Sequence, residues 1–281
     1  MIALIGIMLA LTCLVLWGVS DLITKISLDH ESKWKVLFIS QLSGGLLVLT
    51  LAFFFADLKQ LFSIAVIYLF VLGFMNLCGT YTFYKAIKIK GIALTTPIMN
   101  SWVLVSIILG LIFYNESMSI FQGVAVLLII GGIYLITTNS DKLVFDKSFV
   151  YPILSILIFG IFYFSLKVPN LIFGAVIVTS MIKILTSLFS IPILIKKRIK
   201  ITFIKQKILF YVILIGFLDA LGFLAFNSSL KLAPVSLIAP IVSAAPALSV
   251  VLGILFLKEH ISKRQASGII ITIIGLIIIA I

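Results

Sequence analysis

The chain contains one stretch twice. Residues 84–136 align with residues 227–279 at a constant offset of 143 (259 − 116 = 143), and no gap is needed. The identical pairs include Lys88/Lys231, Pro97/Pro240, Ser106/Ser249, Gly110/Gly253, Glu116/Glu259, Gln122/Gln265 and Gly132/Gly275. A period this long indicates two halves of one fold rather than an array of short repeats. In an apolar chain it is typical of membrane proteins with a binding site where the repeats meet.

The chain is too apolar to fold as a soluble domain. Hydrophobic residues make up 63% of its 281 residues and charged residues 11%, whereas soluble domains carry about 25% charged residues. The net charge of +12 is expected from basic residues that flank membrane spans. Basic and aromatic residues are not interleaved on any polar segment, so we expect the partner to be the lipid bilayer and not a nucleic acid.

Apolar segments of about 20 residues indicate membrane-spanning helices, because a helix satisfies its backbone hydrogen bonds internally. The sequence predicts ten spans, at residues 3–27, 36–57, 62–84, 91–114, 118–138, 149–166, 169–195, 208–230, 233–257 and 265–281. The predicted fold is therefore an all-α integral membrane protein of two five-helix repeats, 1–140 and 149–281. Because five is odd, the second repeat enters the membrane from the opposite side, and the repeats are inverted.

Several motifs make the chain resemble a known family. They are Trp17-Gly18, Ala93–Pro97, Phe113–Ser119, Gln122-Gly123 and Gly131-Gly132 in the first half, and Ala233–Pro240, Phe256–Ser262 and Gln265 in the second. With these motifs the chain resembles the drug/metabolite transporter superfamily, in its ten-helix EamA-type branch. The resemblance covers nearly the whole chain. It implies a transporter and favours export, but it does not identify the solute.

Charged residues inside the predicted spans are costly, so Asp219, Lys183 and Asp21 are candidates for function. Asp219 is near mid-depth in the eighth span, and its repeat counterpart is the polar Asn76 (219 − 143 = 76). Lys183 lies in the seventh span. Asp21 lies in the first span, with Lys25 one helical turn later. For Asp219 and Lys183 the structural alternative is a buried ion pair that joins two helices. For Asp21 it is a local ion pair with Lys25 or snorkelling at the membrane interface.

Other polar and aromatic residues at membrane depth are candidates to line a solute cavity. The complete candidate set is Asp219, Lys183, Asp21, Asn76, Asn100, Trp102, Tyr81, Tyr163, Asn227 and Ser243. Asn100 and Ser243 are repeat partners, three residues beyond Pro97 and Pro240, which is expected of a cavity at the repeat interface. Hydrogen bonding between helices and aromatic packing are the alternatives.

The repeated acids Glu116 and Glu259 are predicted to have a structural role. Each lies where one span ends and the next begins, so its carboxylate can cap the following helix. Catalytic, metal and cofactor sites are not expected. The two cysteines lie in apolar runs, and the two histidines lie apart in polar joints.

The sequence therefore predicts a multi-pass plasma-membrane protein, monomeric or homodimeric, that moves a small polar metabolite by alternating access. Lys183 with Asp219 or Asp21 can bind the carboxylate and ammonium groups of an amino acid or related zwitterion. A proton on an intramembrane carboxylate can couple transport. The chain contains no nucleotide-binding P-loop. The alternatives are a lipid or lipid-phosphate flippase and, less favoured, a membrane-embedded enzyme.

Overall fold

The computed structural model describes residues 2–55, 64–90, 101–137, 150–201, 204–245, 247–248, 251–252, 255 and 262–280. The helices of this part are α1 (Ile2–Leu28), α2 (Lys33–Phe55), α3 (Val66–Lys90), α5 (Trp102–Phe113), α6 (Ile120–Thr137), α7 (Val150–Ser165), α8 (Lys167–Lys196), α9 (Gln206–Ser229), α10 (Val235–Ser243) and α12 (Lys263–Ala280). The described residues contain no strand. The predicted all-α class is therefore confirmed.

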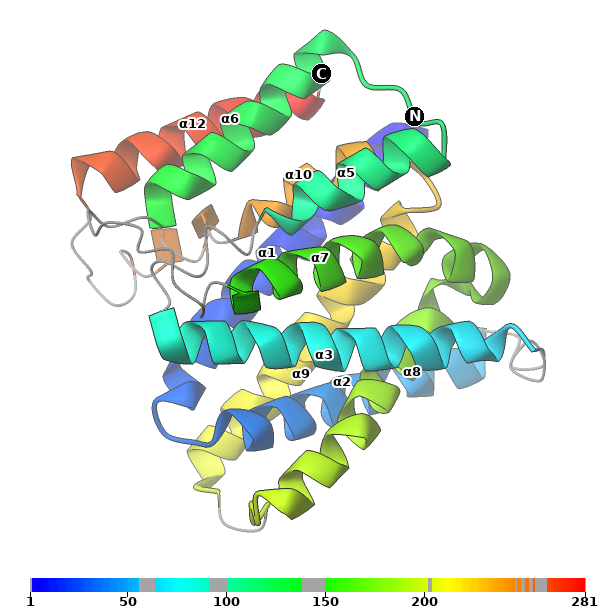
Figure 1. Cartoon of the computed structure of the whole chain (residues 1–281), viewed down its shortest axis with the longest axis vertical. Coiled ribbons are helices and arrows are strands. Elements are labelled where there is room, and N and C mark those ends of the chain that lie inside the picture. The colour runs from blue at the N-terminus through cyan, green and yellow to red at the C-terminus, as the bar shows by residue number, and fades with distance from the viewer. Residues whose placement is uncertain are drawn as a thin grey trace.

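The contacts between helices repeat with a pseudo-twofold symmetry that relates the two halves. Figure 1 shows one of the symmetric pairs, α6 beside α12. In chain order, α1, α2, α3, α5 and α6 correspond to α7, α8, α9, α10 and α12. The contact of α1 with α9 is repeated by α3 with α7, and that of α1 with α10 by α5 with α7. The contact of α2 with α9 is likewise repeated by α3 with α8. Three helices of the first half contact their own counterparts in the second half, in the pairs α2–α8, α5–α10 and α6–α12.

The crossing of α6 and α12 shows this symmetry at the level of single residues. A Cβ atom built on Gly132 would lie 2.7 Å from the carbonyl oxygen of Gly268, and one built on Gly275 would lie 2.9 Å from that of Ala125. The two contacts are repeat equivalents, since 132 + 143 = 275 and 125 + 143 = 268. The repeated glycines are thus explained by close approach of two membrane helices.

Five described helices are long and apolar enough to cross a membrane, namely Ala3–Leu28, Lys33–Phe54, Val66–Phe83, Lys167–Lys196 and Gln206–Ser229. Three shorter apolar helices, Trp102–Phe113, Ile120–Leu135 and Val150–Ser165, fall within the predicted fourth, fifth and sixth spans. The first part of the predicted fourth span and much of the second part of the ninth lie outside the described residues.

Within α8, Gly174 has a φ of 80° and interrupts the helical geometry. Glycine adopts this conformation without strain.

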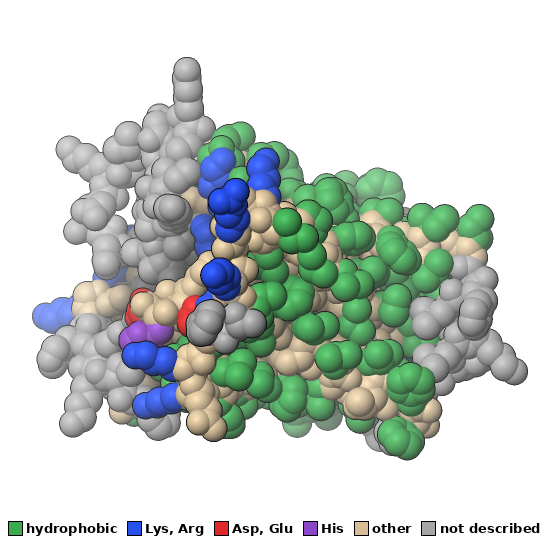
Figure 2. Space-filling model, turned by 90° about the horizontal axis from the view of Figure 1, so that it is seen from below, with side chains coloured by type: hydrophobic (Ala, Val, Ile, Leu, Met, Phe, Trp, Pro, Cys, Tyr) green, Lys and Arg blue, Asp and Glu red, His purple; other side chains and the backbone are tan. Residues whose placement is uncertain are grey.

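The surface is divided between a wide apolar region and a basic end (Figure 2). Phe54, Ile120 and Phe121 are among the large apolar side chains that are more than three-quarters exposed, which is expected of side chains that contact lipid. The visible Lys and Arg side chains gather at one end of the view, beyond the apolar surface. The chain is accordingly a multi-pass membrane protein.

The distribution of charge predicts the orientation of the chain. The joint 196–207 holds Lys196, Lys197, Arg198, Lys200, Lys205 and Lys207, whereas its repeat equivalent 57–60 holds Lys59 alone. Loops rich in Lys and Arg are retained in the cytoplasm. We therefore expect the joints after odd-numbered spans to be cytoplasmic and both termini to be outside, although the family resemblance favours the reverse.

Cysteine labelling can test this orientation. In a background with both native cysteines replaced by alanine, Lys200→Cys should resist a membrane-impermeant maleimide in intact cells and react after the cells are opened. Lys231→Cys, in the joint between α9 and α10, is the matched control and should react in intact cells. The opposite labelling pattern would show that both termini are cytoplasmic.

Candidate functional site: a polar cavity between the repeats

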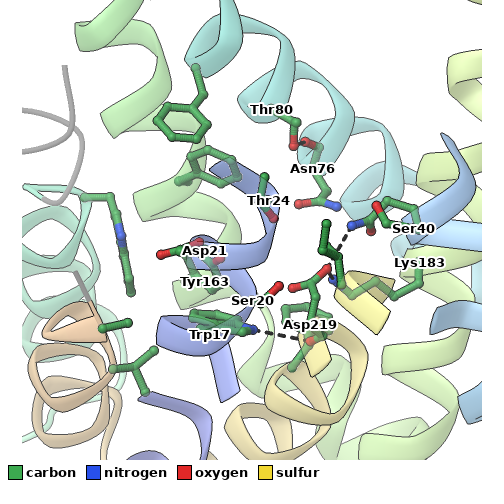
Figure 3. Close-up of a pocket in the computed structure, with 18 of the residues that line it drawn as sticks. Trp17, Ser20, Asp21, Thr24, Ser40, Asn76, Thr80, Tyr163, Lys183 and Asp219 are labelled. Carbon is green, nitrogen blue, oxygen red and sulfur yellow. Dashed lines mark hydrogen bonds and ion pairs between the residues drawn. The ribbon is translucent and has the colours of Figure 1, made fainter. Parts of the chain in front are cut away.

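A cavity of about 290 Å³ lies between the two halves. Helices of both repeats line it, and it extends toward the joint between α1 and α2, where Thr24 and Val36 form part of its wall. Figure 3 shows that polar side chains from α1, α2, α3, α8 and α9 converge on this space. The lining residues are Trp17, Ser20, Asp21, Thr24, Val36, Ser40, Gln41, Asn76, Thr80, Phe83, Trp102, Phe159, Tyr163, Lys183, Ile215, Asp219, Phe223, Val242, Ser243 and Ala245.

An ion pair lies at the inner end of the cavity. Lys183 Nζ lies 2.5 Å from Asp219 Oδ2, and the Lys183 side chain is only 6% exposed. Gln41 Nε2 donates a hydrogen bond of 2.9 Å to the same carboxylate oxygen. The ammonium group also lies 4.9 Å from the ring centre of Phe223. Lys183 is therefore held by Asp219 and an aromatic ring, which offset the cost of burying its charge.

The residues around this ion pair are related by the pseudo-twofold symmetry. Asn76 is the repeat partner of Asp219, as the sequence predicts. Gln41 is the partner of Lys183 at an offset of 142, which is also the offset between Gly18 and Gly160 in the first spans of the two halves. Both amides line the cavity together with the two charged residues. One repeat thus contributes two neutral amides, where the other contributes an acid and a base.

The packing around these residues supports the 142-residue offset for α2 and α8. A Cβ built on Gly216 of α9 would lie 3.1 Å from the backbone nitrogen of Gly44 in α2. The equivalent contact joins Gly73 of α3 to α8, where the Gly73 carbonyl oxygen lies 3.3 Å from Thr186 Oγ1. Thr186 Oγ1 also accepts a hydrogen bond of 2.9 Å from Asn76 Nδ2. The two symmetry-related crossings therefore position both the charged pair and the amide pair.

Aromatic residues form a second part of the cavity wall. The ring centres of Trp102 and Tyr163 are 4.3 Å apart, and those of Trp17 and Tyr163 are 6.0 Å apart. Trp17 Nε1 donates a hydrogen bond of 3.3 Å to the backbone carbonyl of Asp219. Asp21, one helical turn after Trp17, lies beside these rings (Figure 3).

The structure brings most of the predicted site residues together. Asp219, Lys183, Asp21, Asn76, Trp102, Tyr163 and Ser243 line the cavity. Tyr81 does not, because its side chain is exposed and stacks on Trp34, with ring centres 5.7 Å apart. Asn227 is fully buried between α8 and α9. It accepts a hydrogen bond from Asn170 and donates one to Thr179. Asn227 therefore joins α9 to α8 by hydrogen bonds, which was the alternative to lining the cavity. Asn100 lies outside the described residues.

Several polar lining residues were not predicted, among them Gln41, which donates a hydrogen bond to Asp219. A signal for Gln41 was available, because the 142-residue offset of the first spans leads from Lys183 to this residue. Ser20, Thr24, Ser40 and Thr80 had no comparable signal. Small hydroxyl side chains are common in membrane helices, and their orientation toward a cavity depends on helix packing.

At the other end of the helices, Glu116 joins the two repeats. Its Oε1 atom lies 2.7 Å from Lys167 Nζ, and its carboxylate accepts hydrogen bonds of 3.0 Å from the backbone nitrogens of Val235 and Ser236. Glu116 therefore caps α10, which follows Pro234, a residue without a side-chain hydrogen-bonding group. The predicted capping role of Glu116 is confirmed. The helix that it caps was predicted wrongly, because Glu116 caps α10 of the other repeat and not α6, the helix that follows it.

The helix that follows Glu116 has a different cap. The backbone nitrogen of Gln122 donates a hydrogen bond to Ser119 Oγ, and the Ser119 nitrogen donates one to Gln122 Oε1. Ser262 and Gln265 repeat this arrangement before α12. These two reciprocal capping boxes leave Glu116 available for the other repeat. Glu259 lies outside the described residues.

Among the described residues, no three His, Cys, Asp or Glu side chains gather in a way that can hold a metal ion. Cys13 of α1 is buried, and Cys78 of α3 is partly buried. The chemistry of the cavity is thus that of one ion pair, one further carboxylate, amides, hydroxyls and aromatic rings. Such groups can bind a solute through hydrogen bonds, ionic contacts and aromatic contacts.

Comparison with known proteins gives three results. The model of the EamA-like transporter family matches residues 4–138 and again residues 147–281. The uncharacterized protein MJ1333.1 of Methanocaldococcus jannaschii is 34% identical over 140 residues, which is 48% of this chain and 98% of that protein. A crystal structure, described only as that of a protein, superposes with a TM-score of 0.84 at 14% identity, over 97% of this chain and 95% of the other. This last similarity concerns the fold alone.

Proposed function

Because this chain belongs to the EamA-like transporter family, we propose that it is a secondary transporter of the plasma membrane that exports a small polar metabolite by alternating access. The family match agrees with the resemblance found in the repeated motifs, and it places the chain in the drug/metabolite transporter superfamily. The observation that carries the proposal is the polar cavity between the repeats, with the Lys183–Asp219 pair at its inner end.

Alternating access is supported by the difference between the two ends of the helices. The cavity extends toward the joint between α1 and α2. Toward the opposite end, the rings of Phe162 and Phe223 are stacked at 6.1 Å, and beyond them Glu116 joins Lys167 to α10. Transport would require these contacts to separate on one side while the cavity closes on the other.

The expected solute class is an amino acid or a related metabolite. A cavity with acidic, basic and amide groups suits a molecule with more than one polar group, and about 290 Å³ is at the small end of ligand sites. A proton that is bound by Asp219 or Asp21 can couple transport to a proton gradient. The structure favours a solute carrier over a lipid flippase, because polar groups line an internal cavity that both repeats build.

Counterflow can test this proposal. Protein in liposomes that are loaded with an unlabelled amino-acid mixture should accumulate each labelled amino acid that it carries, faster than empty liposomes do. Accumulation of fluorescent lipid analogues in the opposite leaflet, without solute counterflow, would favour the flippase. Chemical conversion of a substrate, without movement of any solute, would favour an enzyme.

A further inference from the structure

Asp21 differs from the other charged residues of the cavity in its contacts. Asp219 is bound by Lys183 and Gln41, whereas Asp21 is exposed within the cavity and has no hydrogen-bond or ion-pair partner among the described side chains. Figure 3 accordingly marks no interaction between Asp21 and the residues drawn. The structure does not describe the side chain of Lys25, which lies one turn later in α1.

The charges of the described cavity lining do not cancel. Its described lining contains two carboxylates, Asp21 and Asp219, and one ammonium group, Lys183. Since Lys183 and Asp219 neutralise each other, an ionised Asp21 has no counter-charge in the described lining. A carboxylate among apolar and aromatic walls acts in a lower dielectric than water, so it attracts a cation and repels an anion strongly.

The walls beside Asp21 suit the same kind of ligand. Trp17 precedes Asp21 by four residues and lies on the same face of α1, and Tyr163 packs between Trp17 and Trp102. Aromatic faces attract ammonium groups through their electron-rich rings. The cavity also contains an acceptor without a partner among the described atoms, the buried Oε1 atom of Gln41, whereas the Lys183 ammonium group is already bound.

We infer that Asp21, Trp17, Tyr163 and Trp102 form a subsite for an organic ammonium group, and that the transported solutes are small amines and ammonium-bearing metabolites. This inference rests on the proposed function, since it assigns the cavity to the solute. It differs from simple zwitterion binding in one respect. The solute must have a positive charge, but it does not need a carboxylate, because Asp219 occupies Lys183 from within the protein.

Three probes with one carbon skeleton can separate these possibilities. Leucine has both charged groups, 3-methylbutylamine lacks the carboxylate, and 4-methylpentanoate lacks the amine. Tetramethylammonium is a fourth probe, a cation that lacks the carbon chain shared by the other three. Binding to the detergent-purified protein can be followed by fluorescence, because two of its three tryptophans line the cavity, and by calorimetry.

We expect tetramethylammonium and 3-methylbutylamine to bind, and 4-methylpentanoate to bind at least tenfold more weakly than the amine. Asp21→Asn should weaken binding of both cations at least tenfold. Asp29→Asn, a carboxylate on the exposed surface, is the matched control and should bind as the wild type does. Lys25→Gln should change the affinity less than twofold.

Three results would overturn the inference. The first is that neither cation binds, and the second is that the acid binds more tightly than the amine. The third is a gain of tenfold or more in cation affinity in Lys25→Gln, which would show that Lys25 already pairs with Asp21. The comparison of wild-type ligands does not depend on the folding of any variant. If counterflow is present but cation binding is absent, only this inference fails. If the cations bind but no solute moves, the transporter proposal fails.

Discussion

Replacement of Asp219 by Asn is expected to reduce solute counterflow to near the level of empty liposomes and to destabilise the protein. The change leaves the Lys183 ammonium group, only 6% exposed, without its counter-ion, and the loss of one partner of a buried pair costs about 3–5 kcal/mol. The freed ammonium group also cancels the remaining negative charge of the cavity. Thermal unfolding in detergent and counterflow in liposomes measure the two effects.

The repeat symmetry supplies a compensating variant. Lys183→Gln combined with Asp219→Asn gives the second repeat the amides that the first has at Gln41 and Asn76. This double variant should be more stable than either single variant, because no buried charge is left unpaired. Lys205→Gln, on the exposed surface, controls for loss of a lysine alone. If the double variant is no more stable than the single variants, the two charges do not act as a pair. Normal counterflow by a folded Asp219→Asn protein would remove Asp219 from the transport site.

Replacement of Glu116 by Ala is expected to have the second-largest effect, chiefly on stability. Its carboxylate neutralises Lys167 and caps the first two backbone nitrogens of α10. The loss of these interactions, which are charge-assisted and nearly buried, is expected to cost about 3 kcal/mol. Ser119→Ala, which removes the local cap of α6, should cost about 1 kcal/mol. Thermal unfolding of the two variants tests whether the contact between repeats matters more than the local one.

The contribution of Glu116 should depend on pH. Burial raises the pKa of its carboxyl group, but the hydrogen bonds from Lys167, Ser236 and Val235 together lower it below its usual range. The folded state therefore favours the ionised form, so the stabilisation is present above the unfolded pKa of about 4.3 and is lost as the pH falls through the lower folded pKa. The difference in melting temperature between the wild type and Glu116→Gln should accordingly shrink at acid pH. A difference that is constant from neutral to acid pH would show that the charge of Glu116 is not involved.

The sequence alone determined the class of the fold and its internal symmetry. Long apolar segments separated by short polar joints require membrane helices, because the bilayer offers no partner for backbone groups. The 143-residue offset paired Gly132 with Gly275 and Asp219 with Asn76, and the structure places each pair at equivalent positions. Intramembrane charge identified Asp219, Lys183 and Asp21, since a buried charge is rare unless it has a partner or a function.

Only the tertiary structure decided which polar residues face one another. Hydropathy places a residue at a depth in the membrane, but its direction depends on the rotation of its helix, which close contacts such as those of Gly44 with Gly216 set. Tyr81 and Asn227 have suitable depth and chemistry, yet they contact Trp34 and Asn170 instead of the cavity. Glu116 caps a helix more than a hundred residues away in the chain, and local sequence cannot indicate that contact. The pairing of Lys183 with Asp219, which leaves Asp21 as the cavity's unpaired described charge, likewise results from the packing of α8 on α9.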